Sequence, residues 1–405
     1  LEPIVGLIDS KIASVINLDT LSAIGIGETI YFVFIWVFIF LAYGTTPLVS
    51  SLNTKNEINK LNYFINFGRN VSILLGLGSF LILYVSSGNL ISTFQPTPNI
   101  QLLSSDYLVF RCIGLPFYLV NMHSTAVLRG LKYAKITFYS ALIVSISNIF
   151  FSLFFGLFLG FGAGGIGFAS SLAFFCASIY STFILKKQLS DIPSTEEQIG
   201  KPSLRKKFFS VGIYILIRSL FLTLFMAYLR NRASLMSMEE IALQHILLQL
   251  WSVGYIFVDA IAIASQTLIS ELVSKKEKYQ NSRLQKELVS VTTAISFILA
   301  IITVLFLDNF VEIFGDDKFD LYIDLQLTVL VALSLFIGCY AFLWDGVLLG
   351  LDRAKEFSFL TVASSISGLL VCTYLLRTLN TISTLWIGLN VSLLFRSLLG
   401  YIYQK

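Results

Sequence analysis

An acidic residue lies inside an apolar run at the start of the chain. The run 1–11 reads LEPIVGLIDSK, and Asp9 lies between Ile8 and Ser10. A charged carboxylate at membrane depth is costly unless it faces a wet cavity or a partner. Such a group can exchange a proton during a transport cycle, or it can serve as a structural hydrogen-bond acceptor between helices. The first role makes Asp9 the candidate site for a coupling proton.

A second group of charges lies in apolar runs of the C-terminal half: Arg218, Asp259 and Asp345. Pairing of Arg218 with one of the aspartates is the structural interpretation, and a role in binding the coupling ion or the substrate is the alternative. If the pairing holds, Arg218→Ala should destabilise the protein more than the combined loss of Arg218 and its aspartate. Three amides could line one wet face of the segment 240–271: Gln244, Gln249 and Gln266.

The sequence lacks the patterns of common enzymes and metal sites. No HExxH or GxSxG motif is present, and the four cysteines show no CxxC spacing. We therefore expect no enzymatic activity, no metal and no cofactor. We also expect no nucleic-acid partner.

The composition indicates a membrane protein. The chain is 56% hydrophobic and 13% charged, with a mean hydropathy of +0.80, which is more apolar surface than a soluble domain can bury. Helices are the expected form of the long apolar runs, because helices satisfy their own backbone groups in lipid. Twelve such segments are predicted, at about 1–16, 20–50, 63–92, 102–129, 136–159, 164–186, 207–229, 240–271, 288–308, 321–350, 357–376 and 382–402.

The connections between these segments alternate in charge. One alternating set, which includes Arg396 and Lys405 at its end, holds twenty Lys and Arg residues, and the other set holds four. The positive-inside rule places the first set and both termini in the cytoplasm. The segment 1–16 then runs outward with Asp9 in its outer half, and we expect it to be incomplete at its start.

Two further charges lie within the predicted segments. Glu28, in the outer third of 20–50, could attract cations at an entrance or simply be solvated at a helix end. Arg111 is interpreted as an interhelical or helix-end polar group.

The two halves of the chain are duplicates. The segment 128–135 (LRGLKYAK) shares Leu, Gly, Leu, Ala and Lys with 348–355 (LLGLDRAK) at an offset of 220. Six segments per repeat give both repeats the same orientation, so we predict two parallel-repeat six-helix bundles around a central cavity. The predicted divisions are an N-lobe (1–186), a cytoplasmic linker (187–206) and a C-lobe (207–405).

Several motifs resemble the multidrug and toxic compound extrusion (MATE) transporters, in particular the DinF-like branch of cyanobacteria and plastids. The resemblance implies twelve helices in two lobes and efflux driven by an inward ion gradient, with a proton taken up at the position of Asp9. The motifs lie in order along the whole chain: Pro3-x-x-Gly6-Leu7-Ile8-Asp9-Ser10, Gly44-Thr45-Thr46, Arg218-Ser219-Leu220, Val258-Asp259-Ala260 and Trp344-Asp345-Gly346-Val347-Leu348-Leu349-Gly350.

The fifth segment departs from the family pattern Asn-x-x-Asn-x-x-x-Asp. Ser145, Asn148 and Ser152 stand at those places, so the second acid of the N-lobe is absent. This departure leaves Asp9 as the main titratable group of its lobe. The polar neighbours expected near it are Asn148, Ser152, Thr45 and Thr46.

These observations together predict a secondary antiporter that exports amphipathic cationic compounds in exchange for protons. Sodium coupling and a lipid-linked oligosaccharide flippase of the same superfamily are the alternatives. We expect a monomer that is integral to the bacterial inner membrane or, in a eukaryote, to a plastid membrane. Its partners would be the lipid bilayer and a small organic substrate.

Overall fold

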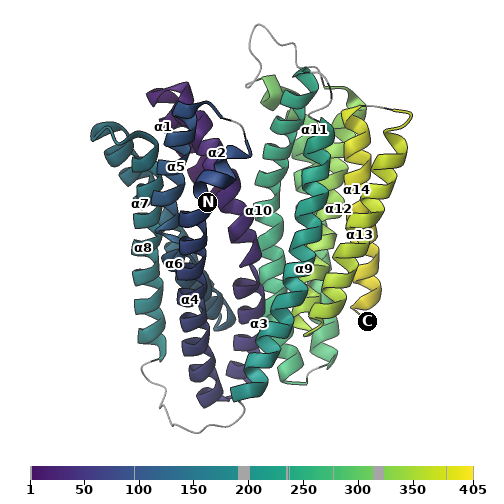
Figure 1. Ribbon diagram of the computed structural model, residues 1–405. Coiled ribbons are helices and arrows are strands. Elements are labelled where there is room, and N and C mark those ends of the chain that lie inside the picture. Colours follow the sequence, from purple (N-terminus) through teal and green to yellow (C-terminus); the bar gives the residue numbers. More distant parts are fainter. Residues whose placement is uncertain are drawn as a thin grey trace. The chain divides into compact units, whose positions relative to one another are not determined.

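The computed structural model describes residues 2–94, 96–189, 201–233, 236, 238–276, 278–312, 323–379 and 381–404, and some helical side chains within these ranges are not described. The elements of this part of the chain are helices, and no strand is found in it (Figure 1). The predicted all-α fold is confirmed.

The chain forms two compact units, Leu1–Gly212 and Ile213–Lys405. Helix α9 (Lys201–Ala233) begins in the first unit and continues in the second. The other elements of the first unit are α1 (Glu2–Ile16), α2 (Leu18–Val37), α3 (Phe40–Thr54), α4 (Ile58–Ser92), α5 (Pro98–Cys112), α6 (Leu115–Gly130), α7 (Ala134–Phe151), the π-helix η1 (Ser152–Phe158) and α8 (Gly162–Leu189). The second unit continues with α10 (Met238–Ser274), α11 (Lys278–Glu312), α12 (Leu325–Gly350), α13 (Ala354–Leu375) and α14 (Ile382–Tyr403).

The elements follow the predicted segments, but some segments are broken. The segment 20–50 becomes α2 and α3, and the segment 102–129 becomes α5 and α6, which meet at an angle of 44°. The segment 136–159 becomes α7 and η1. Within the described ranges nine helices are long and apolar enough to cross a membrane, or ten if α5 and α6 form one span.

The predicted linker 187–206 is helical at both of its ends. Helix α8 continues to Leu189, and α9 begins at Lys201. Lys and Arg are good helix formers, so a basic stretch next to a membrane segment can extend that helix rather than end it. The residues 190–200 lie outside the described ranges.

The backbone repeats itself at the offset of 220 residues. Residues with a positive φ recur as Asn56 (53°) with Lys276 (60°), and as Lys132 (68°) with Asp352 (65°). The helix packing recurs as well, because a Cβ at Gly130 would lie 2.7 Å from the carbonyl oxygen of Thr46, and one at Gly350 would lie 2.9 Å from that of Gln266.

A small apolar core holds α1 against its neighbours in the first unit. Ile12 and Ala13 of α1 pack with Ile24 of α2, Tyr107 of α5 and Ile166 of α8. Asn17 separates α1 from α2, because its side chain accepts a hydrogen bond from the Thr20 backbone at 2.7 Å and so caps α2. This core fixes the face of α1 that carries Asp9.

A tight turn sets α7 and η1 beside α8. Gly160 and Gly162 adopt φ of 71° and 56°, values that glycine reaches without steric cost. The chain therefore reverses over a few residues, and α8 packs along α7 and η1. This reversal brings polar residues of α7 and α8 face to face.

Candidate functional site

Asp9 is buried in the first unit and hydrogen-bonded to the start of the π-helix. Its side chain accepts a hydrogen bond from Ser152, with 2.7 Å between Oγ and Oδ1, and Asp9 is 1% exposed. Ser152 is the first residue of η1. Single π-helical turns inside α-helices frequently occur at functional sites.

Asn148, one turn before Ser152 on α7, connects Asp9 to α8. With its amide turned so that both ends are satisfied, its nitrogen donates to the two carboxylate oxygens of Asp9 at 3.0 and 3.2 Å, and its oxygen accepts from Ser170 Oγ at 2.8 Å. In the opposite orientation the Asn148 nitrogen donates to Ser170 Oγ at 2.8 Å. The first orientation suits an ionised Asp9, and the second suits a protonated Asp9 that donates to the amide oxygen.

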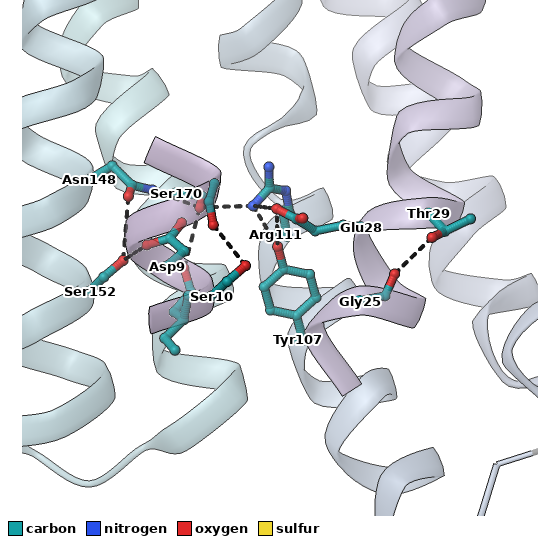
Figure 2. A network of polar contacts seen from close by, with 12 residues as sticks. Asp9, Ser10, Gly25, Glu28, Thr29, Tyr107, Arg111, Asn148, Ser152 and Ser170 are labelled. Atoms are coloured by element: carbon teal, nitrogen blue, oxygen red, sulfur yellow. Dashed lines mark hydrogen bonds and ion pairs between the residues drawn. The ribbon is translucent and has the colours of Figure 1, made fainter. Parts of the chain in front are cut away.

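Ser170 extends this network to a buried arginine on α5 (Figure 2). Arg111 Nη1 donates to Ser170 Oγ at 3.1 Å and to the hydroxyl of Tyr107 at 2.5 Å. The same nitrogen lies 3.6 Å from Glu28 Oε1, which also accepts from the Tyr107 hydroxyl at 3.4 Å. The network thus joins acids on α1 and α2 through polar residues of α7, α8 and α5.

Aromatic rings surround the guanidinium of Arg111. Its carbon Cζ lies 4.6 Å from the ring centroid of Tyr31, 5.5 Å from that of Tyr107 and 6.0 Å from that of Phe32. Two glycines make room for the backbone and ring of Tyr107. A Cβ at Gly27 would lie 2.4 Å from the Tyr107 ring, and one at Gly167 would lie 2.4 Å from its carbonyl oxygen.

The structure corrects the placement of Glu28. Its side chain is 20% exposed and paired with Arg111, so it is neither a solvated helix-end group nor an isolated entrance charge. The sequence held a signal for this cluster, because Tyr107 and Arg111 are four residues apart on one helix and share a face. The sequence did not indicate which acid faces Tyr107 and Arg111, and the structure shows that it is Glu28.

The structure also places Thr45 and Thr46 away from Asp9. Thr45 Oγ1 lies 3.5 Å from Nδ1 of His123, and Thr46 Oγ1 donates to the backbone oxygen of Ala126 at 3.1 Å. Thr45 lies seventeen residues beyond Glu28, or about 25 Å at a rise of 1.5 Å per residue. In Figure 1, α1 and α3 accordingly lie at opposite ends of the first unit.

Asp345 of the second unit lies between two arginines. Arg396 binds both carboxylate oxygens, with its Nε 3.1 Å from Oδ1 and its Nη2 against Oδ2, and Arg218 Nη2 lies 3.6 Å from Oδ2. Arg396 is only 2% exposed, so its sequence-based assignment to a cytoplasmic connection is wrong. Counting charges near segment ends ignores the depth of a side chain, and this arginine belongs to the interior of α14.

The other polar candidates of the second unit are dispersed. Gln244 accepts a hydrogen bond from the indole nitrogen of Trp386 at 2.9 Å, and Gln266 is buried where α10 crosses α12. Asp259 is half-buried, and the side chain of Gln249 lies outside the described residues. Across the described ranges no group of three or more His, Cys, Asp or Glu side chains could hold a metal ion.

The three charged residues of this network, Asp9, Glu28 and Arg111, define the chemistry available there. Asp9 and Glu28 together carry one negative charge more than Arg111 balances when both acids are ionised. A buried cluster strongly favours electrical neutrality, because net charge is poorly solvated there. One proton or one monovalent cation would restore it.

A family model described as MatE matches residues 1–154 and 210–374. The chain belongs to the MatE family. The two matched stretches fall in the two halves of the duplicated chain, and the predicted membership is confirmed. MatE proteins are integral to membranes, in keeping with the long apolar helices found here.

Two plant proteins of Arabidopsis thaliana are among the relatives of the chain. Protein DETOXIFICATION 43 is 22% identical over 334 residues, which are 82% of this chain and 62% of that protein. Protein DETOXIFICATION 44, chloroplastic, is 22% identical over 422 residues, covering 98% and 78%. The chain therefore spans less than two thirds of the length of the first of these relatives.

A bacterial flippase matches a shorter part of the chain. Lipid II flippase MurJ of Thermosipho africanus is 28% identical over 159 residues, which are 37% of this chain and 33% of that protein.

Solved structures share the fold over the whole chain. One described as the outward-facing conformation of a multidrug resistance MATE family transporter has a TM-score of 0.90 at 15% identity, covering 100% of this chain and 91% of its own. A crystal structure of MATE in complex with MaL6 also has a TM-score of 0.90, at 14% identity, with the same coverage.

Proposed function

We propose that this MatE protein is a secondary transporter that exports amphipathic organic cations in exchange for protons, by alternating access. The observation that carries the proposal is the buried Asp9 carboxylate, held by Ser152 and linked through Asn148 and Ser170 to Arg111. The name of a similar solved protein, a multidrug resistance transporter, supports organic compounds as the cargo.

Charge balance explains why a proton and an organic cation would exclude one another. Either of them neutralises the single excess negative charge of Asp9, Glu28 and Arg111. Binding of one therefore removes the electrostatic attraction for the other. Mutual exclusion at one buried charge is the thermodynamic requirement of antiport.

The groups that face Asp9 support a proton rather than a sodium ion. Alkali and alkaline-earth cations are bound by several oxygen atoms that direct lone pairs at the ion. Ser152 instead directs a hydroxyl hydrogen at Asp9, and Asn148 can direct amide hydrogens at both of its oxygens. These donors stabilise a bare carboxylate, which a proton can then neutralise without further ligands.

Protonation of Asp9 would change the interactions of Arg111 on α5, because the hydrogen bonds that connect the two residues would reverse their direction. A protonated Asp9 donates to Asn148, whose amide then turns to donate to Ser170. Ser170 Oγ would then accept from both Asn148 and Arg111, while the attraction of Arg111 toward Asp9 is lost. Arg111 is thereby biased toward Glu28, its other partner at 3.6 Å.

The substrate class follows from the groups around the guanidinium of Arg111. Glu28 supplies an anionic group, and Tyr31 and Phe32 supply aromatic faces, which attract organic cations. We propose that the chain acts as a monomer in a bacterial inner membrane or a plastid membrane, with both termini on the cytoplasmic side. The name of a chloroplastic relative supports the second location.

A flippase for lipid-linked oligosaccharides is the second candidate, favoured by the likeness to Lipid II flippase MurJ. Such a substrate carries a pyrophosphate and needs cationic groups that can receive it. The buried arginines of the second unit, Arg218 and Arg396, are both bound to Asp345. Neither of these two arginines is left to receive a pyrophosphate in the second unit, and this supports the exporter over the flippase.

The test is transport of ethidium by purified protein in proteoliposomes under an imposed pH gradient. Asp9→Asn should lose gradient-driven transport by at least about tenfold, because its amide cannot exchange a proton. Asp106→Asn is the matched control, since Asp106 is an exposed carboxylate of α5. Undiminished transport by a correctly folded Asp9→Asn protein overturns the proposal. Transport that follows a sodium gradient at equal pH supports sodium coupling instead.

A further inference from the structure

A second polar site lies in the first unit, between α4, α6 and α8. It is a cavity of about 60 Å³. On α8 its lining begins at Thr182, twelve residues or about 18 Å beyond Ser170 of the Asp9 network. The polar residues that line it are Asn62, Asn66, Arg69, His123, Ser124, Thr182 and Lys186.

The cavity is lined by positive charge alone. Arg69 and Lys186 contribute cationic groups, and no Asp or Glu is among its lining residues. No described carboxylate forms an ion pair with either of these cations. Amide and hydroxyl groups complete the lining, and both can donate hydrogen bonds. This combination is suited to an anion with several oxygen atoms.

One hydroxyl of the cavity lining makes no described hydrogen bond. Ser124 is 1% exposed and lines the cavity, yet none of the described hydrogen bonds involves its side chain. A serine hydroxyl can both donate and accept hydrogen bonds. The neighbouring His123 is already engaged, because its Nε2 lies 3.1 Å from the backbone oxygen of Ile65. Ser124 is therefore available to a ligand in the cavity.

The surface beside the cavity is apolar. Thr182 and Lys186 share one face of α8 with Ile179 and Phe183, at helical spacings of three and four residues. Ile179 is 54% exposed and Phe183 is 64% exposed. Exposed apolar side chains on a membrane helix contact acyl chains, so a lipid could extend from the cavity over this face.

We propose that this cavity binds a phosphate group, and that an anionic phospholipid headgroup is its source. The loop charges of the sequence place this end of the first unit at the cytoplasmic leaflet, which is the anionic one. Basic pockets between membrane helices on that side commonly hold lipid phosphates. Arg69 and Lys186 bind the phosphate charge, Ser124 donates to one of its oxygens, and the acyl chains lie against Ile179 and Phe183.

The test is native mass spectrometry of the full chain titrated with phosphatidylglycerol or phosphatidylcholine. The wild type should retain phosphatidylglycerol preferentially, and the double variant Arg69→Gln/Lys186→Gln should bind it about tenfold more weakly. The matched control is Lys135→Gln/Lys355→Gln, which removes two exposed cations from the first turns of α7 and α13. Ser124→Ala, which removes only the hydroxyl, should also weaken retention of phosphatidylglycerol.

A parallel titration with inorganic phosphate, read as thermal stabilisation, separates the two sources. Protection by phosphate that depends on Arg69 and Lys186, without preference for phosphatidylglycerol, keeps the phosphate site but assigns it to a soluble anion. Equal losses in the two double variants overturn the proposal, because they would show only a general effect of charge. Absence of binding by either probe overturns it as well.

Discussion

Ser152 donates a hydrogen bond to Asp9 at 2.7 Å, although 143 positions of the sequence separate them. The hydroxyl belongs to the residue at which α7 gives way to the π-helix η1. A π-helical turn shifts the side chains that follow it around the helix axis. The departure from α-helix and the contact with Asp9 both occur at Ser152. In the family pattern, this position carries an acid.

Ser152→Ala should therefore move the pH dependence of transport to more alkaline values. The hydroxyl stabilises the ionised form of Asp9, and without it the proton is held to higher pH. A hydrogen bond to a charged group contributes about 1.5–3 kcal/mol, so a shift of about one to two pH units is expected. Transport rates measured across a pH series would show it. Ser145→Ala, two turns earlier on α7, is the control and should leave the profile in place, since the Ser145 hydroxyl bonds to its own helix.

Loss of Arg111 should cost more stability than loss of both Arg111 and Glu28. Arg111→Gln leaves the partly buried Glu28 carboxylate without its counter-charge, and breaking such a pair costs about 3 kcal/mol. Adding Glu28→Gln should recover part of that loss. Thermal unfolding of the purified single and double variants measures the coupling. Strict additivity of the two changes would contradict the pairing.

In the second unit, loss of an arginine together with its aspartate should cost more stability than loss of the arginine alone. From the sequence, loss of Arg218 together with its aspartate is expected to be milder than loss of Arg218 alone. The structure reverses this expectation, because Asp345 also binds Arg396, which would lose that carboxylate in the double variant. We expect Arg218→Ala/Asp345→Ala to be less stable than Arg218→Ala by about 2 kcal/mol or more. Unfolding midpoints of the two purified proteins decide between these patterns.

Glycines at the repeated helix crossings should tolerate no side chain. Gly130→Ala would place a Cβ 2.7 Å from the backbone oxygen of Thr46, and separating the helices should cost about 1–3 kcal/mol. Gly78→Ala on α4 is the control, since a Cβ at that position would have no atom within 4 Å. That change should instead be neutral or stabilise the helix by up to about 1 kcal/mol. Equal effects of the two substitutions in thermal unfolding would argue against the crossing.

The sequence by itself determined the helical segments, the duplication and two polar neighbours of Asp9. Long apolar runs can satisfy their backbone groups in lipid only locally, so hydropathy alone marks the helices. The motif repeat at an offset of 220 reappears in the backbone at Lys132 and Asp352. Asn148 and Ser152 were named as neighbours of Asp9 because they stand at the family's polar positions, and both lie against it.

The tertiary structure alone decided which charges meet. Thr45 was expected near Asp9 and lies beside His123, while Arg111 and Arg396 pair with Glu28 and Asp345. Position along a helix fixes the height of a side chain at 1.5 Å per residue, but its partners depend on how helices from distant parts of the chain are rotated and packed. That packing is set by many small contacts, such as those of Tyr107 with Gly27 and Gly167, which no local pattern encodes.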